Sequence, residues 1–167
     1  MTVREWLVAS GLIEGPNGIL LVQNRRRNGS LDWSPPGGVV EVADGESVEE
    51  GLTREVAEET GLVVSGWEGP VYRVEAVATG LGWHLRVEVY RARGFSGQLR
   101  TGDPDGIVVD ARFVDPAGCD GHLAAAHQWV REPLAAWLAS RWADGRSYRY
   151  RVEGDVPGQP VAVLRQS

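Results

Sequence analysis

One segment restricts the fold of this chain more than any other. It is a Glu-rich stretch, Ser47–Thr60, that contains no proline and is followed directly by Gly61. A glycine just past the last residue is typical of a helix that ends there, so the stretch is predicted to be an α-helix. At about 100° per residue, carboxylates spaced i, i+3 and i+4 share one helix face, and Glu55, Glu58 and Glu59 have this spacing.

The predicted acidic face overlaps the apolar face of the same helix, because Val48 and Leu52 lie beside Glu55 and Glu59. Like charges at this spacing destabilise a helix by roughly 0.2 to 0.5 kcal/mol per pair, and partial burial raises the penalty. A compensating cation is therefore expected, and magnesium is usually held by a few carboxylates together with substrate phosphates. The alternative is a solvated acidic face, against which the overlap with the apolar face argues.

Two further residues of this helix suggest that its acidic face belongs to a binding site. Gly51 lies one turn before Glu55, where a side chain would obstruct an approaching loop, metal or phosphate. A mid-helix glycine destabilises a helix by about 1 kcal/mol relative to alanine, which favours a steric reason for it. Arg54 lies near Glu58 and is predicted to hold a carboxylate in a fixed orientation rather than to bind substrate.

The region before the helix reads as strand and loop. Glu5–Ile13 and Ile19–Gln23 are apolar stretches separated by the turn-forming residues 15–18, which predicts a β-hairpin. The residues from Trp33 to Val40 include Ser-Pro-Pro-Gly-Gly, which cannot form a helix interior, so a loop leading into a short strand is expected.

The region after the helix is predicted to be mostly sheet. Strands are expected at Val71–Ala78, Leu85–Ala92 and Ile107–Val114, and a late helix, in one piece or two, at His122–Trp142. Alternating tyrosine, valine and charged residues from position 146 onward predict a C-terminal β-hairpin.

Composition narrows the function classes. The length of 167 residues suits one compact domain. The net charge of −6 argues against a binder of nucleic-acid polymers, although small anionic substrates remain open if a cation bridges the repulsion. The only cysteine, Cys119, offers neither an internal disulfide nor a zinc pattern. No apolar run approaches the roughly 20 residues that span a bilayer, and no signal-peptide pattern is present, so a cytoplasmic location without membrane contact is expected.

The helix and its flanks resemble the Nudix box, whose pattern is Gly, five residues, Glu, seven residues, then Arg-Glu-apolar-x-Glu-Glu-x-Gly-apolar. Glu46, Arg54, Glu55, and the run from Glu58 to Leu62 match this pattern residue by residue. Upstream, seven residues separate Gly38 from Glu46 where the family has five. We interpret the difference as a two-residue insertion near Ala43-Asp44, in a loop where extra length is tolerated.

This resemblance implies an α/β (α+β) fold, a Nudix-like α/β/α sandwich with a mixed β-sheet. The Nudix domain would cover residues 1–145, with residues 146–167 as a C-terminal β extension packed on it. The resemblance also implies a divalent cation, Mg²⁺ or Mn²⁺. Its ligands would be Glu55, Glu58, Glu59 and the Gly38 carbonyl. Arg54, Glu46 and Gly61 would hold the site in place. Metal-held water would then attack phosphorus.

Several residues outside the helix are candidates for substrate contact. The basic loop of Arg25, Arg26 and Arg27 could bring at least one guanidinium to the substrate phosphates, with Arg25, Arg27 and Gly37 as the predicted contacts; the alternative is a solvated loop. The resemblance leaves the general base open, because family members differ: it is either one of the three helical glutamates or an acid from a later loop. Asp103 and Asp105 are the candidates here, and building a turn is the equally weighted alternative.

The aromatic residues allow two interpretations. Trp129, Trp137 and Trp142 recur at helical spacing, which indicates either core or a homodimer face. Trp67 and Trp83 are the candidates for stacking on a nucleotide base, and the sequence gives no reason to choose between them.

The resemblance predicts an enzyme that hydrolyses a diphosphate linkage in a nucleoside diphosphate joined to another group. The candidate substrates are nucleoside triphosphates, oxidised nucleotides, dinucleoside polyphosphates and nucleotide sugars. The competing hypotheses are a non-catalytic nucleotide-binding or regulatory module on the same fold, and an isomerase of a diphosphate-bearing lipid precursor. Intact helical glutamates argue against the first, and the lack of further cysteines against the second.

Overall fold

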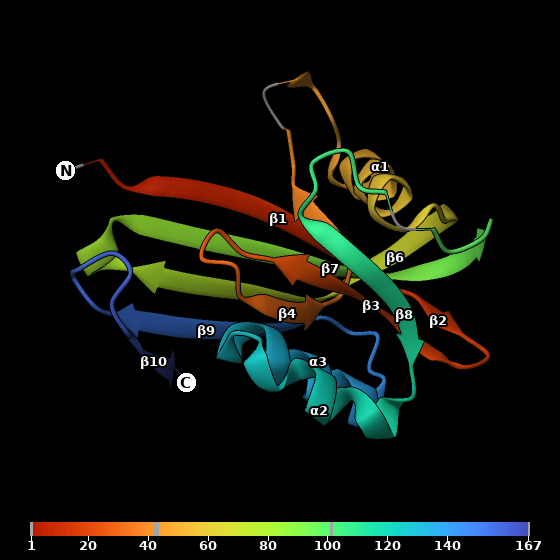
Figure 1. Cartoon of the computed structure of the whole chain (residues 1–167). Coiled ribbons are helices and arrows are strands. Elements are labelled where there is room, and N and C mark those ends of the chain that lie inside the picture. The colour runs from red at the N-terminus through yellow and green to blue at the C-terminus, as the bar shows by residue number, and fades with distance from the viewer. Residues whose placement is uncertain (1, 42–43, 101, 167) are drawn as a thin grey trace.

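A computed structural model describes residues 2–41, 44–100 and 102–166. It is a mixed α+β structure in which α1 lies on one side of the strands and α2 and α3 lie on the other (Figure 1). The helices are α1 (Val48–Thr60), α2 (Cys119–His122) and α3 (Gln128–Ser140), and the strands are β1 (Arg4–Leu12), β2 (Glu14–Gly15), β3 (Gly18–Arg25), β4 (Leu31–Ser34), β5 (Gly37–Val39), β6 (Val63–Ala78), β7 (Trp83–Ser96), β8 (Val108–Val114), β9 (Arg146–Glu153) and β10 (Ala162–Gln166).

The strands form two sheets. The larger has the order β10-β9-β6-β7-β1-β5, in which β1 pairs with β7 and β6 pairs with β9 in parallel, while the other pairs are antiparallel. The smaller has the order β2-β3-β4, with β8 also paired to β3. The predicted mixed sheet between helices is therefore confirmed.

The predicted N-terminal hairpin is wrong in its extent. The chain does reverse after Glu14–Gly15, but its pairing with the start of β3 is short: these two residues pair with Gly18 and Ile19, and the Leu20 N–H donates to the Ile13 carbonyl at 2.9 Å. β1 instead runs parallel to β7 in the larger sheet, while β3 joins β8 in the smaller one. Turn residues specify where a chain reverses, whereas the partner of each long strand is set by nonlocal burial.

Strands β6 and β7 are longer than predicted. β6 begins at Val63 rather than Val71 and continues through Gly66, Gly69 and Pro70. Register shifts between β6 and β7 around Gly66 and between Glu68 and Tyr72 accommodate these residues. Bulges of this kind allow glycine and proline inside a strand pair that a pattern of hydrophobicity would end early.

The late helix consists of separate pieces. α2 is followed by a short 3₁₀ segment, Leu123–Ala125, and then by α3, which retains Pro133 in its interior. At the other end of the chain, β9 and β10 form the predicted C-terminal hairpin, and β9 extends the larger sheet beside β6. No helix among the described residues is long and apolar enough to cross a membrane.

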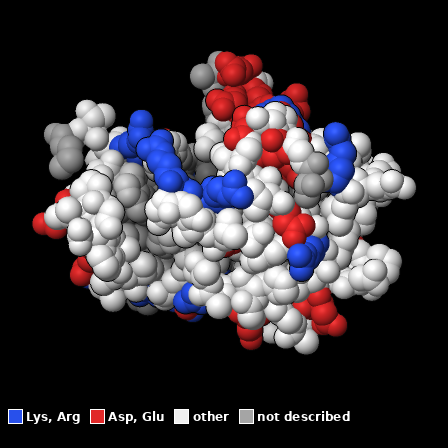
Figure 2. Space-filling view, viewed as in Figure 1, with Lys and Arg blue, Asp and Glu red and all other residues white. Residues whose placement is uncertain are grey.

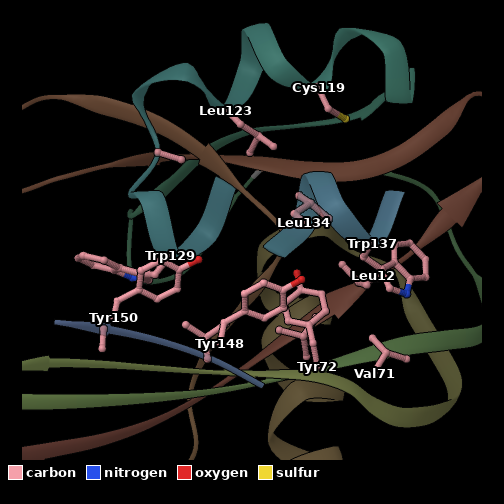
Figure 3. Close-up of a cluster of buried hydrophobic side chains, with 14 of the residues drawn as sticks. Leu12, Val71, Tyr72, Cys119, Leu123, Trp129, Leu134, Trp137, Tyr148 and Tyr150 are labelled. Carbon is pink, nitrogen blue, oxygen red and sulfur yellow. The ribbon is translucent and has the colours of Figure 1, made fainter. Parts of the chain in front are cut away.

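Two hydrophobic clusters hold the layers together. One lies between α1 and the sheet and contains Leu52 and Val56. The other lies under α2 and α3, where aromatic side chains from β6 and β9 meet those of α3 (Figure 3). Trp129, Trp137 and Trp142 all belong to this second cluster. Their indoles therefore pack in the core of the chain itself, which is the first of the two interpretations offered by the sequence.

Candidate active site

Helix α1 is fixed at both ends. The Ser47 hydroxyl accepts a hydrogen bond from the Glu50 N–H, and the Glu50 carboxylate accepts one from the Ser47 N–H, which forms a capping box. At the other end, Gly61 has a φ of 77°, a left-handed conformation that favours glycine. With Leu52 and Val56 buried against the sheet, the helix has one rotational setting.

This setting brings two carboxylates against the glycine pair of β5. Glu59 is only 5% exposed, and its Oε1 accepts a hydrogen bond of 3.2 Å from the Gly37 N–H. A Cβ on Gly38 would lie 2.7 Å from the Glu55 carboxyl carbon. Residue 38 must therefore be glycine for the Glu55 carboxylate to lie where it does.

Arg54 links the neighbouring acids. Its Nε and Nη2 donate to the two oxygens of Glu46 at 2.8 and 3.0 Å, and its Nη1 donates to Glu55 at 3.1 Å and to Glu58 at 3.5 Å. A Cβ on Gly51 would lie 2.7 Å from Glu46 Oε1. The glycine at position 51 thus makes room for the Glu46 carboxylate, rather than for the incoming loop, metal or phosphate that the sequence suggested.

The carboxyl groups of this cluster differ in their electrostatic surroundings. Burial raises the pKa of Glu59 to about 8, and the negative charge of Glu55 adds to the effect. Burial also raises the pKa of Glu55, although Arg54 partly opposes the shift. The hydrogen bonds from Arg54 lower the pKa of Glu46. Two acids are therefore held where their negative charge is poorly compensated, whereas a third is stabilised in its carboxylate form by Arg54.

The carboxylate oxygens of this cluster suit a hard cation that is bound by the protein and by substrate phosphates together. In the part of the chain that the structure describes, no three His, Cys, Asp or Glu side chains converge as a complete metal cage. However, magnesium is usually bound by only one or two carboxylates together with water and substrate phosphates. Glu55 and Glu59 supply two such carboxylates, and among the described residues Glu59 accepts one hydrogen bond, which leaves its burial largely uncompensated. These residues fit a divalent cation.

A cavity of about 630 Å³ connects this acidic cluster to an aromatic surface. At its carboxylate end the cavity is lined by Gly37, Gly38, Glu55, Glu59, Asp103 and Asp105. At its aromatic end it is lined by Trp6, Trp83, Leu85, His127, Trp129 and Val130. Figure 2 shows acidic residues gathered over α1 and the loop before it, with basic residues on either side.

The aromatic end has ordered ring geometry. The His127 ring stacks on Trp129 with centroids 4.2 Å apart and an interplanar angle of 8°. Trp83 meets Trp129 edge to face at 6.0 Å. Burial lowers the pKa of His127, so its ring is favoured in the neutral form. A flat apolar ligand group would find several ring surfaces here.

The chain is similar in sequence and in structure to proteins of known family. A model of the NUDIX domain matches residues 5–138. The chain belongs to the Nudix family. It is 42% identical over 133 residues to the ADP-ribose pyrophosphatase of Methanocaldococcus jannaschii, a match that covers 78% of this chain and 73% of the relative. The family and this relative identify the chain as a Nudix hydrolase that acts on phosphorus-containing acid anhydrides.

Solved structures agree with the Nudix assignment. A MutT NUDIX hydrolase from Burkholderia pseudomallei is 26% identical, with a TM-score of 0.59 over 68% of this chain and 85% of that one. The MutT protein from Bacillus halodurans is 20% identical, with a TM-score of 0.65 over 96% of this chain and 97% of that one. The second likeness concerns the fold alone, and it extends over nearly the whole chain.

Helix α1 carries the three glutamates that the sequence predicted as cation ligands, but the structure gives them different surroundings. Glu55 and Glu59 line the cavity, whereas Glu58 is turned to Arg54 and does not line it. Of the insertion proposed near Ala43-Asp44, residue 43 lies outside the described residues. The Asp44 N–H donates to the Glu41 carbonyl at 3.1 Å, a turn within the loop that precedes the Nudix helix.

The basic loop brings one of its three arginines to the cavity, and it is not one of the two named as contacts. All three side chains are exposed, but Arg26 lines the cavity whereas Arg25 and Arg27 do not. Arg26 is oriented by Asp32, which accepts from its Nε at 2.6 Å and from its Nη2 at 2.7 Å. The sequence signal that distinguishes Arg26 is the acid six residues later, on the returning strand β4.

The two loop acids have different surroundings. The Asp103 carboxylate accepts hydrogen bonds from the N–H groups of Asp105, Ile107 and Val108, so it builds the turn. Both acids line the cavity, but the Asp105 side chain accepts no hydrogen bond from any residue that the structure describes. Its negative charge contributes to the raised pKa of Glu55.

The two candidates for base stacking are also distinguished. Trp67 is buried under α1, where its Nε1 donates to the Thr53 hydroxyl at 2.9 Å, and it does not line the cavity. Trp83 lines the aromatic end. Sequence reasoning missed His127 and Trp129 as members of this end, because α3 is distant from β7 along the chain and only the fold brings them together.

Proposed function

We propose that this Nudix hydrolase uses Mg²⁺, or Mn²⁺, to hydrolyse the diphosphate linkage of a nucleoside diphosphate joined to a sugar, with ADP-ribose as the first substrate to test. The observation that carries the proposal is a cavity that has carboxylates at one end and aromatic rings at the other. The similarity to an ADP-ribose pyrophosphatase supports the same substrate class.

The cavity has the length that such a substrate needs. Ser10 of β1 pairs with Gly37 of β5 and with Val89 of β7, so Val89 marks the carboxylate end. From Val89 back to Trp83, strand β7 extends about 20 Å at a rise of about 3.3 Å per residue. A diphosphate at the carboxylate end can therefore leave its nucleoside against the aromatic end.

Each residue of the carboxylate end receives a role in this proposal. Glu55, Glu59 and the Gly38 carbonyl would hold the cation, and Glu58 is the further carboxylate candidate beside them. A bound cation would supply an activated water and neutralise charge on the departing phosphate. Arg54, itself held by Glu46, keeps Glu55 and Glu58 in position. Asp105 is the acid placed to accept a proton from water.

The test is hydrolysis of a nucleotide panel by the full chain, with Mg²⁺ and with a chelator. The panel contains ADP-ribose, UDP-glucose, diadenosine tetraphosphate and dGTP, and chromatography follows the mononucleotide products. We expect ADP-ribose to yield AMP and ribose phosphate only when metal is present. The Glu55→Gln variant should lose this activity. Glu49→Gln, an exposed acid in the first turn of the same helix, is the matched control.

A second variant, Glu58→Gln, decides whether Glu58 belongs with the cation ligands. Loss of activity comparable to that of Glu55→Gln would place it there, and a small loss would restrict it to its contact with Arg54. Hydrolysis that continues in the chelator, or a panel in which no nucleotide is cleaved, would overturn the proposed function.

A further inference from the structure

A buried polar network forms part of the cavity wall between its two ends. Asn24 of β3 is 7% exposed, and Asp32 of β4 is 8% exposed. The Asn24 Nδ2 donates to Asp32 Oδ1 at 3.1 Å and to the Ser34 hydroxyl at 2.9 Å. Arg26 donates two further hydrogen bonds to Asp32. Asn24, Arg26 and Ser34 all line the cavity, so the network presents polar groups to a ligand.

The network fixes which way the Asn24 amide points. Asp32 offers only acceptors to it, a carboxylate oxygen and a backbone carbonyl, so the Asn24 nitrogen must face Asp32. The amide oxygen, Oδ1, accepts no hydrogen bond from any described residue. Nor is it one of the polar atoms that are fully buried without a partner among these residues, so it retains some exposed surface. The Asn24 Oδ1 therefore reaches the cavity as an unused acceptor.

Hydrogen-bond donors lie directly beside this acceptor. Because the Ser34 hydroxyl oxygen accepts from Asn24, its own proton is directed elsewhere, and it donates to no described residue. Arg26 uses its Nε and Nη2 for Asp32, which leaves the N–H groups of Nη1 available. The wall thus places one acceptor next to donors.

We propose that this wall reads the base of the substrate and selects one that carries an amino group beside an unprotonated ring nitrogen. The inference rests on the proposed function, because it assigns the nucleoside to this cavity. Adenine and cytosine both present such an edge, an amino donor next to a nitrogen acceptor. Hypoxanthine and uracil present the reverse, a carbonyl acceptor next to an N–H donor. The Asn24 Oδ1 would face that carbonyl oxygen, and neither group could donate.

The test compares nucleotides that differ only at this edge. Binding of AMP, IMP, CMP and UMP to the full chain is measured by titration calorimetry without metal, so that no hydrolysis is needed. We expect IMP to bind at least about tenfold more weakly than AMP, since a mismatched buried hydrogen-bonding group weakens binding by this order. The CMP and UMP pair shows whether the wall accepts a pyrimidine as well as a purine.

Variants assign the discrimination to the wall. Asn24→Ala should bring the AMP and IMP affinities to within about threefold of each other. Gln23→Ala, the preceding amide on β3, does not line the cavity and should leave the ratio unchanged. If Asn24→Ala does not fold, Ser34→Ala keeps the Asn24 acceptor and should weaken AMP more than IMP.

The outcomes separate this inference from the proposed function. Equal binding of AMP and IMP to the unaltered protein, or no binding of any of the four nucleotides, would overturn the base-reading wall even if ADP-ribose is hydrolysed. A tenfold preference that survives Asn24→Ala would also overturn it. Clear discrimination without any hydrolysis would retain the wall and reject the proposed activity instead.

Discussion

The two ends of the cavity are built in opposite ways. At the carboxylate end, Glu55 and Glu59 come from one short helix and meet a glycine pair on the adjacent strand. At the aromatic end, Trp6, Trp83 and Trp129 come from three elements that lie far apart along the chain. In the proposed function, the two helical carboxylates come from one short segment and are joined by Asp105 from a later loop, whereas recognition of the rest of the substrate would depend on elements brought together by the tertiary fold. Substitutions at the two ends should therefore affect different quantities.

The largest effect is expected for Glu59→Gln. Loss of this carboxylate should lower kcat on the order of 10²- to 10³-fold with Mg²⁺ present, because a neutral amide is a poor ligand for a hard cation. The metal-free protein should be as stable as the unaltered one or more so, because the substitution removes a buried, poorly compensated acid. Kinetics and calorimetry on one preparation measure both, and a marked loss of stability would contradict this account.

The next effect distinguishes the two loop acids. Asp105→Asn should lower kcat on the order of 10²-fold with an unchanged melting temperature, as expected for an acid that faces the cavity without structural partners. Asp103→Asn should lower the melting temperature, because three backbone N–H groups lose a charged acceptor. If both variants lose only stability, neither acid takes part in proton transfer.

A smaller effect on a different parameter is expected at the aromatic end. Trp83→Ala should raise KM for ADP-ribose roughly tenfold with little change in kcat, because stacking on a base contributes about 1 to 3 kcal/mol. Trp83→Phe retains a ring and should recover much of the loss. A fall in kcat with an unchanged KM would place Trp83 in the chemistry and would remove the contrast between the two ends.

The same contrast decides what the sequence could predict. Helix α1 and the shared face of Glu55 and Glu59 follow from spacing alone, because a helix relates neighbours by a fixed angle. The steric reason for Gly51 could not be predicted, since it depends on where the Glu46 side chain folds back. The selection of Arg26 over its neighbours likewise depends on the pairing of β3 with β4, which brings Asp32 alongside.

The aromatic end and the strand partners show what local patterns leave out. The tryptophans signalled burial, but spacing could not show that Trp83 and Trp129 meet at one cavity. In the same way, residues 15–18 predicted a reversal correctly, but did not show that β1 would pair in parallel with β7. Both results depend on contacts between residues that are distant along the chain, which neither periodicity nor turn chemistry encodes.

The last prediction concerns the dependence of stability on pH and isolates the burial of Glu59. Its pKa is raised from an ordinary value of 4.5 to about 8, so between these values the folded metal-free protein holds a proton that the unfolded chain releases. The free energy of unfolding should therefore fall as pH rises through this window, by at most about 1.4 kcal/mol per pH unit.

His127 acts in the opposite direction, because its lowered pKa makes the unfolded chain bind the extra proton below about pH 6.5. The measurement is therefore the difference in denaturant stability between the unaltered protein and Glu59→Gln, followed from pH 5 to pH 8 in a chelator. The histidine contribution cancels in this difference, and the slope that remains belongs to Glu59. Adding Mg²⁺ at pH 8 should stabilise the unaltered protein more than the variant, since only the former offers the cation a buried carboxylate. A difference that is flat across this range would mean that Glu59 ionises in the folded protein as readily as in water, and the carboxylate end would then need no cation to compensate its burial.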